Sequence, residues 1–270
     1  MTTSTSTSTS TPAPDNEAVT LTRRGPIAYV LLNRPQSINA ISLDTRRLLP
    51  RAMDDANADP QVHVVVVHGA GDKGFCAGAD IKAFAVPEPA SSYRNTRVDN
   101  HWMAGFDRCR KPIIAAIHGV CFGGGVDIAL ACDLRVASED ALFALPETGH
   151  GVIGVTQRGI RMIGMAHTLD MALTGRRVPA HEAKTMGLVT QVVPRDQLMA
   201  SVDKLAALIA SKAPLATRFA KEAIRSGADL SYAAGNTLEL DLMALLVNSE
   251  DRLEAGRAFA EKRAPVFKGC

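Results

Sequence analysis

Two carboxylates stand twenty residues apart in unusually apolar surroundings. Asp127 comes directly after the glycine-rich segment 123–126, and Glu147 follows the nearly uncharged run 141–146. Two carboxyl groups in one apolar pocket should have divergent pKa values, so that one holds a proton while the other is ionised. Such a pair can serve as general acid and general base. The alternatives are that Asp127 is an acid favoured by a helix dipole, and Glu147 a capping acid or half of an ion pair.

Two glycine-rich turns, residues 74–82 and 118–127, could present backbone amides beside these acids. Each turn follows a predicted buried strand, and we expect each to open a helix. A glycine turn at a helix start directs free N–H groups and the positive dipole end at one point, which favours an anion. Neither turn has the features of a P-loop or of a dinucleotide fingerprint, so phosphate binding is not expected there. Glycine can also serve only to allow tight packing.

Runs of strand length alternate with helical patterns around these turns, which predicts an α/β fold. The predicted strands are rich in Val and Ile and cover residues 27–33, 64–68, 112–118, 134–137 and 189–193. An amphipathic helix between the first two strands carries an apolar face made of Leu48, Leu49, Ala52, Met53 and Ala56. Four further helices are predicted at 202–212, 215–226, 232–248 and 251–263. The leucine stripe of the third one (238, 242, 245 and 246) is too apolar for a lone surface helix.

The chain therefore divides into three parts. Residues 1–16 are a Thr/Ser-rich tail that we expect to be disordered, because it cannot bury enough surface to offset its ordering entropy. Residues 17–195 form the α/β core, and residues 196–270 form a helical C-terminal region that packs on the core or on a neighbouring subunit. Pocket width should depend on the segment 84–106, where Pro87, Pro89, Trp102 and Phe106 are candidates to line a lid.

Composition excludes several classes of protein. The 270 residues are 46% hydrophobic and 21% charged with a net charge of +2, which gives no reason to expect nucleic acid or an anionic membrane as partner. No run is long and apolar enough for a membrane span or a signal peptide. The five cysteines show no C-x-x-C spacing, which favours a reducing compartment, and we expect a cytoplasmic protein. No metal site is expected.

Several segments resemble the enoyl-CoA hydratase/isomerase (crotonase) family, over nearly all of residues 17–268. They are Asn33-Arg34-Pro35 with Asn39-Ala40, FCAGADIK at 75–82, KPIIAAIHG at 111–119, GGGVDIALACDLRVAS at 123–138, LPE at 145–147 and LTGRRVPAHEAKTMGLV at 173–189. The resemblance implies a spiral of β-β-α units with a helical C-terminal region. It also implies homotrimers or dimers of trimers, and an acyl-CoA substrate with coenzyme A entering as part of that substrate rather than as a permanently bound cofactor.

The resemblance also assigns roles to residues. It implies that the amides of Ala79 and Gly124 form an oxyanion hole for the thioester oxygen, that Asp127 positions or helps to activate water, and that Glu147 exchanges a proton with the α-carbon. It places the coenzyme A contacts at Arg34, Ala40, Ala77, Asp80, Ile81 and Lys82, with Phe267 and Lys268 reaching the coenzyme A of a neighbour. A solvated surface charge is the alternative reading for the basic residues among these.

Two features depart from the hydratases of the family. Asp127 is one methylene shorter than the glutamate they hold there, and a Gly-Gly-Gly-Val-Asp turn also occurs in dienoyl-CoA isomerases. Those isomerases carry a further aspartate downstream, where this chain has only Val152, Ile153 and Val155. The loop between Glu147 and the Thr-Gln-Arg step at 156–158 is also short, which changes the floor of the acyl pocket. His150 lies in that loop, and we expect it to face solvent.

Four functions follow as hypotheses. The leading one is reversible hydration of a 2-enoyl-CoA, and the nearest rival is a double-bond isomerase in which Glu147 shuttles the proton. A third is a thioester hydrolase with Cys121 as nucleophile, although its spacing from His118 puts the two on opposite faces of a strand. The last is an RNA-binding member of the family. The predicted first helix argues against it, because Arg46, Arg47 and Arg51 are balanced there by Asp44, Asp54, Asp55 and Asp59.

Overall fold

Two sheets at the centre of the molecule carry every strand of the part that the structure describes, which is residues 17–80, 89–99 and 101–270 of a computed structural model. The large sheet has the order β1-β2-β3-β5-β7-β10, in which only the β1–β2 pair is antiparallel. Its strands are β1 (Val19–Arg24), β2 (Ile27–Leu32), β3 (Val64–Gly69), β5 (Ile113–Ile117), β7 (Leu134–Ser138) and β10 (Gln191–Val193). The small sheet contains β4 (Gly74–Cys76), β6 (Val120–Phe122), β8 (Leu142–Ala144) and β9 (Val178–Pro179).

The chain alternates between the two sheets as it winds. It places β3, β5 and β7 in the large sheet and the strand that follows each of them, β4, β6 and β8, in the small one. The tightest of these crossings is at Gly119, where φ is +50° and a side chain would collide with the carbonyl group of Lys73. Helix α4 (Gly124–Ala131) then completes the unit that begins with β5. The predicted spiral of β-β-α units is confirmed, and solved structures of the same fold are reported below.

The parallel strands are continuous apolar runs because both faces of the large sheet are covered. Residues 64–67 of β3 and 113–117 of β5 are fully buried. One face packs against α1 (Leu43–Ala58) and the small sheet, and the other packs against α7 (Leu198–Ala210) through Leu198, Val202 and Ala206. The predicted face of α1 is confirmed, with only Leu48 left half-buried. Ser42 caps this helix by accepting a hydrogen bond from the amide of Thr45.

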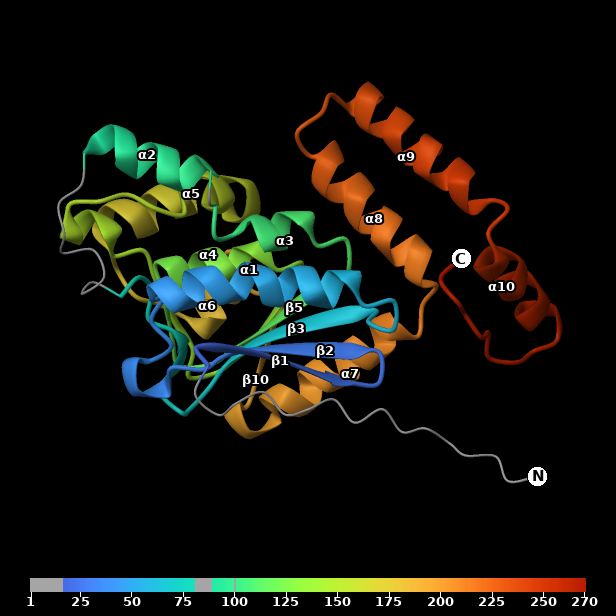
Figure 1. The fold of residues 1–270 in the computed structure, drawn as a ribbon, viewed down its shortest axis with the longest axis horizontal. Helices are drawn as coiled ribbons and strands as arrows, with labels where there is room; N and C mark the ends of the chain where they lie inside the picture. The colour runs from blue at the N-terminus through green and yellow to red at the C-terminus, as the bar shows by residue number, and fades with distance from the viewer. Residues whose placement is uncertain (1–16, 81–88, 100) are drawn as a thin grey trace.

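The remaining helices lie around this core or extend away from it (Figure 1). They are α2 (Ala90–Asp99), α3 (Ala104–Arg108), α5 (Thr156–Thr174), α6 (Ala180–Thr185), α8 (Pro214–Gly227), α9 (Tyr232–Leu246) and α10 (Glu250–Ala260), with short 3₁₀ helices at Pro35–Ser37, Glu147–His150 and Arg195–Gln197. Among the described residues, no helix has both the length and the apolar character needed to cross a membrane.

One lid prediction is wrong. Phe106 in α3 is only 2% exposed and belongs to the main hydrophobic core, because α3 lies on α1 with Gly105 pressed against Pro50. Trp102 is half-buried and packs against the same core, with the guanidinium of Arg46 over its ring. Residues 84–88 of the proposed lid, including Pro87, lie outside the described residues.

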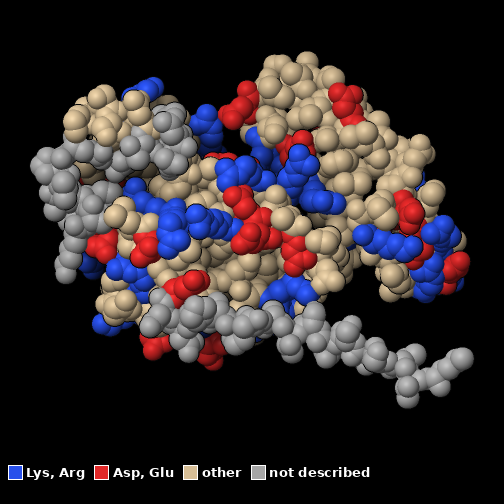
Figure 2. Space-filling view, viewed as in Figure 1, with Lys and Arg blue, Asp and Glu red and all other residues tan. Residues whose placement is uncertain are grey.

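Helices α8, α9 and α10 extend away from the sheets and end in a C-terminus on the far side from α4 and α5 (Figure 1). Asp133 ties this extension to the core, because its carboxylate lies 2.8 Å from Lys221 Nζ and 2.7 Å from Arg225 Nε of α8. The surface over α9 carries few charges (Figure 2). Large apolar side chains are exposed there, among them Tyr232 at 90% and Leu245 at 65%. Only Leu242 of the predicted leucine stripe is buried.

Candidate active site

The amide of Gly124 is the first N–H group of α4 and has no acceptor among the described residues. The first N–H groups of a helix have no partner within the helix, so they remain available to a ligand. Gly123 makes the turn possible with a φ of +50°, and its own amide bonds to the carbonyl of Ala144. Gly125 lets α4 lie directly on the backbone of Cys76 in β4. The predicted helix start at the second glycine turn is confirmed.

A β-bridge to a distant loop holds the backbone of Ala79. Ala79 lies in a parallel β-bridge opposite Ile41, where the amide of Ile41 bonds to the carbonyl of Gly78 and the amide of Asp80 to the carbonyl of Ile41. In such a bridge the N–H of the central residue points away from the partner strand. No described residue accepts from it. A β-bridge therefore positions this amide, while residues 81–88, where the expected helix would begin, lie outside the described part.

The loops that carry these two amides lie against each other. A Cβ atom built on Gly124 would lie 3.8 Å from the amide nitrogen of Ala79, and one built on Gly78 would lie 3.5 Å from the amide nitrogen of Gly124. Glycine at both positions lets the two loops approach this closely. Two unpaired donors at this spacing can stabilise a single oxyanion.

The carboxylate of Glu147 lies against the same turn. A Cβ on Gly123 would lie 2.6 Å from Oε1 of Glu147, and one on Gly154 would lie 3.3 Å from the same atom. The other oxygen, Oε2, is buried and has no hydrogen-bond partner among the described residues. Burial raises the pKa of Glu147, and the negative charge of Asp127 adds to the rise. The group is thus suited to hold a proton and to exchange it with a substrate.

Asp127 in the first turn of α4 is the second acid. Its Oδ1 atom lies 3.1 Å from Nε of Arg158, a residue of α5 that was not among the predicted site residues. Burial raises the pKa of Asp127, while the Arg158 guanidinium opposes that rise. Because Asp127 also contributes to the raised pKa of Glu147, the two acids are electrostatically coupled, as the sequence predicted.

An apolar cavity of about 340 Å³ opens beside Glu147. Its walls come from the loop after Glu147 and from α5, and include Ile153, Ile160, Met165 and Leu169. Helix α5 is interrupted at Gly164, whose φ of +78° is not helical. The cavity has room for an apolar chain next to the acid, although much of Met165 and Leu169 remains exposed in the single chain.

Three of the predicted coenzyme A residues, Arg34, Ala40 and Asp80, are joined by hydrogen bonds. Arg34 donates from Nη1 to the carbonyl of Ala40 at 2.6 Å and to Oδ2 of Asp80 at 3.0 Å. Asn39 holds this loop in place, since its buried side chain donates to the carbonyls of Ala70 and Gly74 and accepts from the amide of Arg34. A cavity of about 470 Å³ lies alongside, with Arg34 in its wall.

The other predicted contacts have different outcomes. The amide of Ala77 bonds to the carbonyl of Ile38, which aligns its strand with the Arg34 loop. Ile81 and Lys82 lie outside the described residues. Phe267 and Lys268 belong to the C-terminal tail, which Figure 1 places far from α4 and α5 of the same chain. Within one chain the structure therefore does not bring this pair to the site.

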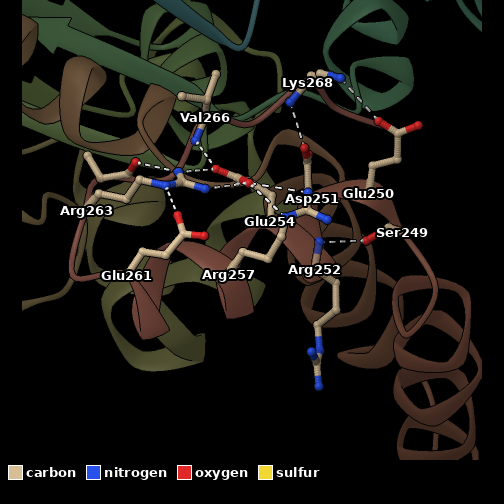
Figure 3. Close-up of polar contacts among 11 residues, drawn as sticks. Ser249, Glu250, Asp251, Arg252, Glu254, Arg257, Glu261, Arg263, Val266 and Lys268 are labelled. Carbon is tan, nitrogen blue, oxygen red and sulfur yellow. Dashed lines mark hydrogen bonds and ion pairs between the residues drawn. The ribbon is translucent and has the colours of Figure 1, made fainter.

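The C-terminal tail is held by a buried acid of α10 (Figure 3). Asp251 is 2% exposed, and its carboxylate accepts from the amides of Lys268 at 2.6 Å and Gly269 at 2.9 Å. Arg263 pairs with Glu254 on the neighbouring turn. The tail that carries Phe267 and Lys268 thus has a defined path along α10.

Two further expectations concern residues outside the acid pair. Cys121 is fully buried and burial raises its pKa well above the ordinary value, while Nε2 of His118 pairs with the carbonyl of Gly71. This arrangement gives no activated thiolate, so the expectation that Cys121 packs in the core is confirmed. His150 is exposed, as predicted.

Known proteins resemble this chain over most of its length. The model of the enoyl-CoA hydratase/isomerase family matches residues 22–270. The (E)-benzylidenesuccinyl-CoA hydratase of Thauera aromatica is 39% identical over 256 residues, which covers 93% of this chain and 99% of that protein. The carnitinyl-CoA dehydratase of Salmonella typhi is 38% identical over 261 residues, with 94% and 99% covered.

A solved structure extends the likeness to the fold. The enoyl-CoA hydratase of Bacillus anthracis superposes with a TM-score of 0.89 at 36% sequence identity, over 94% of this chain and 100% of that one. The likeness thus includes the two sheets, the glycine turns and the helical C-terminal region together.

Proposed function

Since the chain belongs to the enoyl-CoA hydratase/isomerase family and is an acyl-CoA enzyme of that kind, we propose that it catalyses the reversible hydration of a 2-enoyl-CoA to a 3-hydroxyacyl-CoA. One observation carries this proposal: two unpaired amides, of Ala79 and Gly124, lie on adjoining loops beside Glu147, whose buried Oε2 atom has no partner among the described residues. An enolate needs two donors on its oxygen and an acid at its α-carbon.

The two amides stabilise the thioester oxygen. As water adds to the double bond, negative charge moves onto that oxygen, and preorganised donors interact with it more strongly than with the neutral carbonyl. Each donor of this kind contributes roughly 3 kcal/mol. Neither amide has a competing acceptor in the described part of the chain, so no hydrogen bond to a described residue must be broken when the substrate enters.

The two acids handle the two protons of the reaction. The oxygen of water bonds to C3 and loses a proton to Asp127, while Glu147 delivers a proton to C2. The reverse reaction regenerates water from these groups. This division of labour agrees with the raised pKa of Glu147 and with the cation beside Asp127. Positioned acid and base groups contribute about 10²- to 10⁴-fold to such rates.

Coenzyme A is proposed to lie along the loop of Arg34, Ala40, Ala77 and Asp80, continuing to Ile81 and Lys82. The hydrogen bonds that join Arg34, Ala40 and Asp80 support a common binding surface. Phe267 and Lys268 would contribute from a neighbouring subunit, in a homotrimer or a dimer of trimers. The exposed apolar side chains of α9, such as Tyr232 and Leu245, are suited to be covered in that assembly.

The acyl group is proposed to be apolar, because most of the side chains that line the cavity beside Glu147 are apolar. Two relatives of nearly equal identity are named for different acyl groups, benzylidenesuccinyl and carnitinyl. Overall likeness therefore does not select among acyl groups, and the side chains of the cavity must do so.

The experiment is to incubate the protein with crotonyl-CoA and to follow the absorbance of the enoyl thioester. A hydratase consumes the chromophore and yields a 3-hydroxyacyl-CoA, which mass spectrometry identifies. A second candidate, double-bond isomerisation with Glu147 as shuttle, is favoured by the ion pair that engages Asp127. It would leave the 2-enoyl chromophore intact and convert a 3-enoyl-CoA instead. A panel of chain lengths and branched acyl groups, all inactive in hydration, would overturn the proposal.

A further inference from the structure

Arg158 lies between two carboxylates at the edge of the proposed site. It belongs to the first turn of α5, and its side chain is 21% exposed. Its Nε atom lies 3.1 Å from Oδ1 of Asp127 on α4, and its Nη2 atom lies 2.8 Å from Oδ1 of Asp107 on α3. One guanidinium thus joins three helices and uses different nitrogen atoms for the two acids.

The surroundings of Asp127 are asymmetric. The charged and titratable groups that face it are Arg158 from α5, Asp107 from α3, His101 from the segment before α3, and Glu147 from the 3₁₀ helix after β8. Arg158 and His101 favour the carboxylate form, whereas Asp107 and Glu147 disfavour it. Arg158 is the only one of these groups in direct contact, and among the described residues Oδ2 of Asp127 has no partner of its own.

Glu147 has the opposite surroundings. No cation contacts it within the described part of the chain, its Oε2 atom is buried without a partner, and the nearest basic group, His150, is exposed. A proton shared between the two acids is therefore held better by Glu147, because Asp127 alone has a permanent positive charge at hydrogen-bond distance.

The start of α5 carries a second, independent sign of functional constraint. Val155 precedes the helix with a φ of +61°, a conformation that is unusual for a β-branched residue. Such strained backbone occurs preferentially at functional sites. Here it joins Gly154, which packs on the Glu147 carboxylate, to the turn that carries Arg158. One residue of unusual backbone conformation thus connects the segment that packs on Glu147 to the turn that carries Arg158.

On the proposed hydration, we infer that Arg158 is a positioning residue: it holds Asp127 as a carboxylate with Oδ2 turned to the water, and so leaves Glu147 as the acid that carries the proton. Aspartate is one methylene shorter than glutamate, so this carboxylate needs an external anchor to face a shared water. Asp107 completes the arrangement by fixing the far side of the guanidinium.

Arg158→Gln and Arg161→Gln form a matched pair for the test. Both residues lie on α5, but Arg161 pairs with the exposed Asp229 and contacts neither acid. Hydration requires ionised Asp127, so activity falls as pH drops through its pKa, and Arg158 limits the rise in that pKa that burial causes. We expect the acid limb of kcat/KM to move to higher pH in Arg158→Gln, and kcat to fall on the order of tenfold to a hundredfold. Arg161→Gln should match the wild type, and Arg158→Lys should recover part of the loss.

Asp107→Asn provides a prediction of opposite sign. It removes a negative charge that faces Asp127 while the guanidinium remains, so the acid limb should move to lower pH. A purely structural role for Arg158 would not produce shifts in two directions. If Arg158→Gln fails to fold, the direction of the pH shift in Asp107→Asn decides the test. An acid limb of kcat/KM that stays in place or moves to higher pH overturns the inference.

The outcomes also separate this inference from the proposed function. A wild-type protein that hydrates no enoyl-CoA would overturn the proposed function, and the role of Arg158 with it. A wild type that hydrates crotonyl-CoA, with pH profiles for Arg158→Gln and Arg161→Gln that coincide, would overturn the role of Arg158 alone.

Discussion

Replacing Gly78 by alanine tests whether the two amides act together. Gly78 has a φ of +94°, and a Cβ there would lie 2.8 Å from the carbonyl oxygen of Phe122. Ordinary contacts begin at 3.4 Å, so the loops that carry Ala79 and Gly124 must separate by about 0.6 Å. Loss of one well-placed donor costs about 3 kcal/mol of transition-state stabilisation, which is roughly a hundredfold or more in kcat. The left-handed backbone costs alanine a further 1–2 kcal/mol or so of folding stability.

The assay measures kcat and KM for crotonyl-CoA together with the thermal stability of each variant. Gly25→Ala is the control, because Gly25 has a φ of +56° but open space around its Cβ position, in the turn between β1 and β2. Both variants should lose similar stability, and only Gly78→Ala should lose kcat. We expect kcat to change more than KM, because the amide donors interact more strongly with the transition state than with the bound substrate. A folded Gly78→Ala protein with the kcat of Gly25→Ala would refute the paired-amide reasoning.

Three further changes test other parts of the structure. Glu147→Gln should lower hydration by about 10²- to 10⁴-fold. Burial raises the pKa of Glu147, so the stability of the wild type decreases as pH rises from the ordinary glutamate range through that raised pKa. The melting temperature of the variant should therefore exceed that of the wild type in alkaline buffer and equal it in acid. Asp133→Ala should cost about 3 kcal/mol, because Lys221 is 11% exposed and loses its counter-ion. Hydrogen exchange should then show α8 opening before the sheet, and uniform protection would contradict this. Asp251→Ala should let the amide hydrogen of Lys268 exchange with solvent and should raise KM while kcat stays constant. An unchanged KM would argue against contact between the tail and coenzyme A.

The large sheet could be predicted from the sequence because its inner strands are buried on both faces. Such strands are uninterrupted apolar runs, and 64–67 and 113–117 stand out for that reason. The strands of the small sheet are only two or three residues long, too short for any period to show. The edge strand β1 was also missed, because VTLTRR is increasingly exposed toward its end.

The acids and the Gly124 turn could be identified from residue type and local spacing. Arg158 could not, because its contact with Asp127 arises only when α4 and α5 pack together, and the Thr-Gln-Arg step served in the sequence only to mark the end of a loop. The orientation of Ala79 likewise depends on a partner, Ile41, that is distant in sequence. Phe106 was assigned to a lid because an aromatic residue in a polar stretch does not reveal which neighbour it packs on.

The bridge between Ile41 and Ala79 has a mechanical consequence. The loop that ends at Ile41 begins at Arg34, and Asn39 fixes its middle through three hydrogen bonds to backbone groups. On the proposed function, Arg34 at one end of this rigid loop contacts the nucleotide part of coenzyme A. Ile41 at the other end holds Ala79, whose amide binds the thioester oxygen. Binding of coenzyme A at Arg34 can therefore restrict the motion of the Ala79 amide. The same short loop then contributes both to the affinity for coenzyme A and to the rate of the reaction.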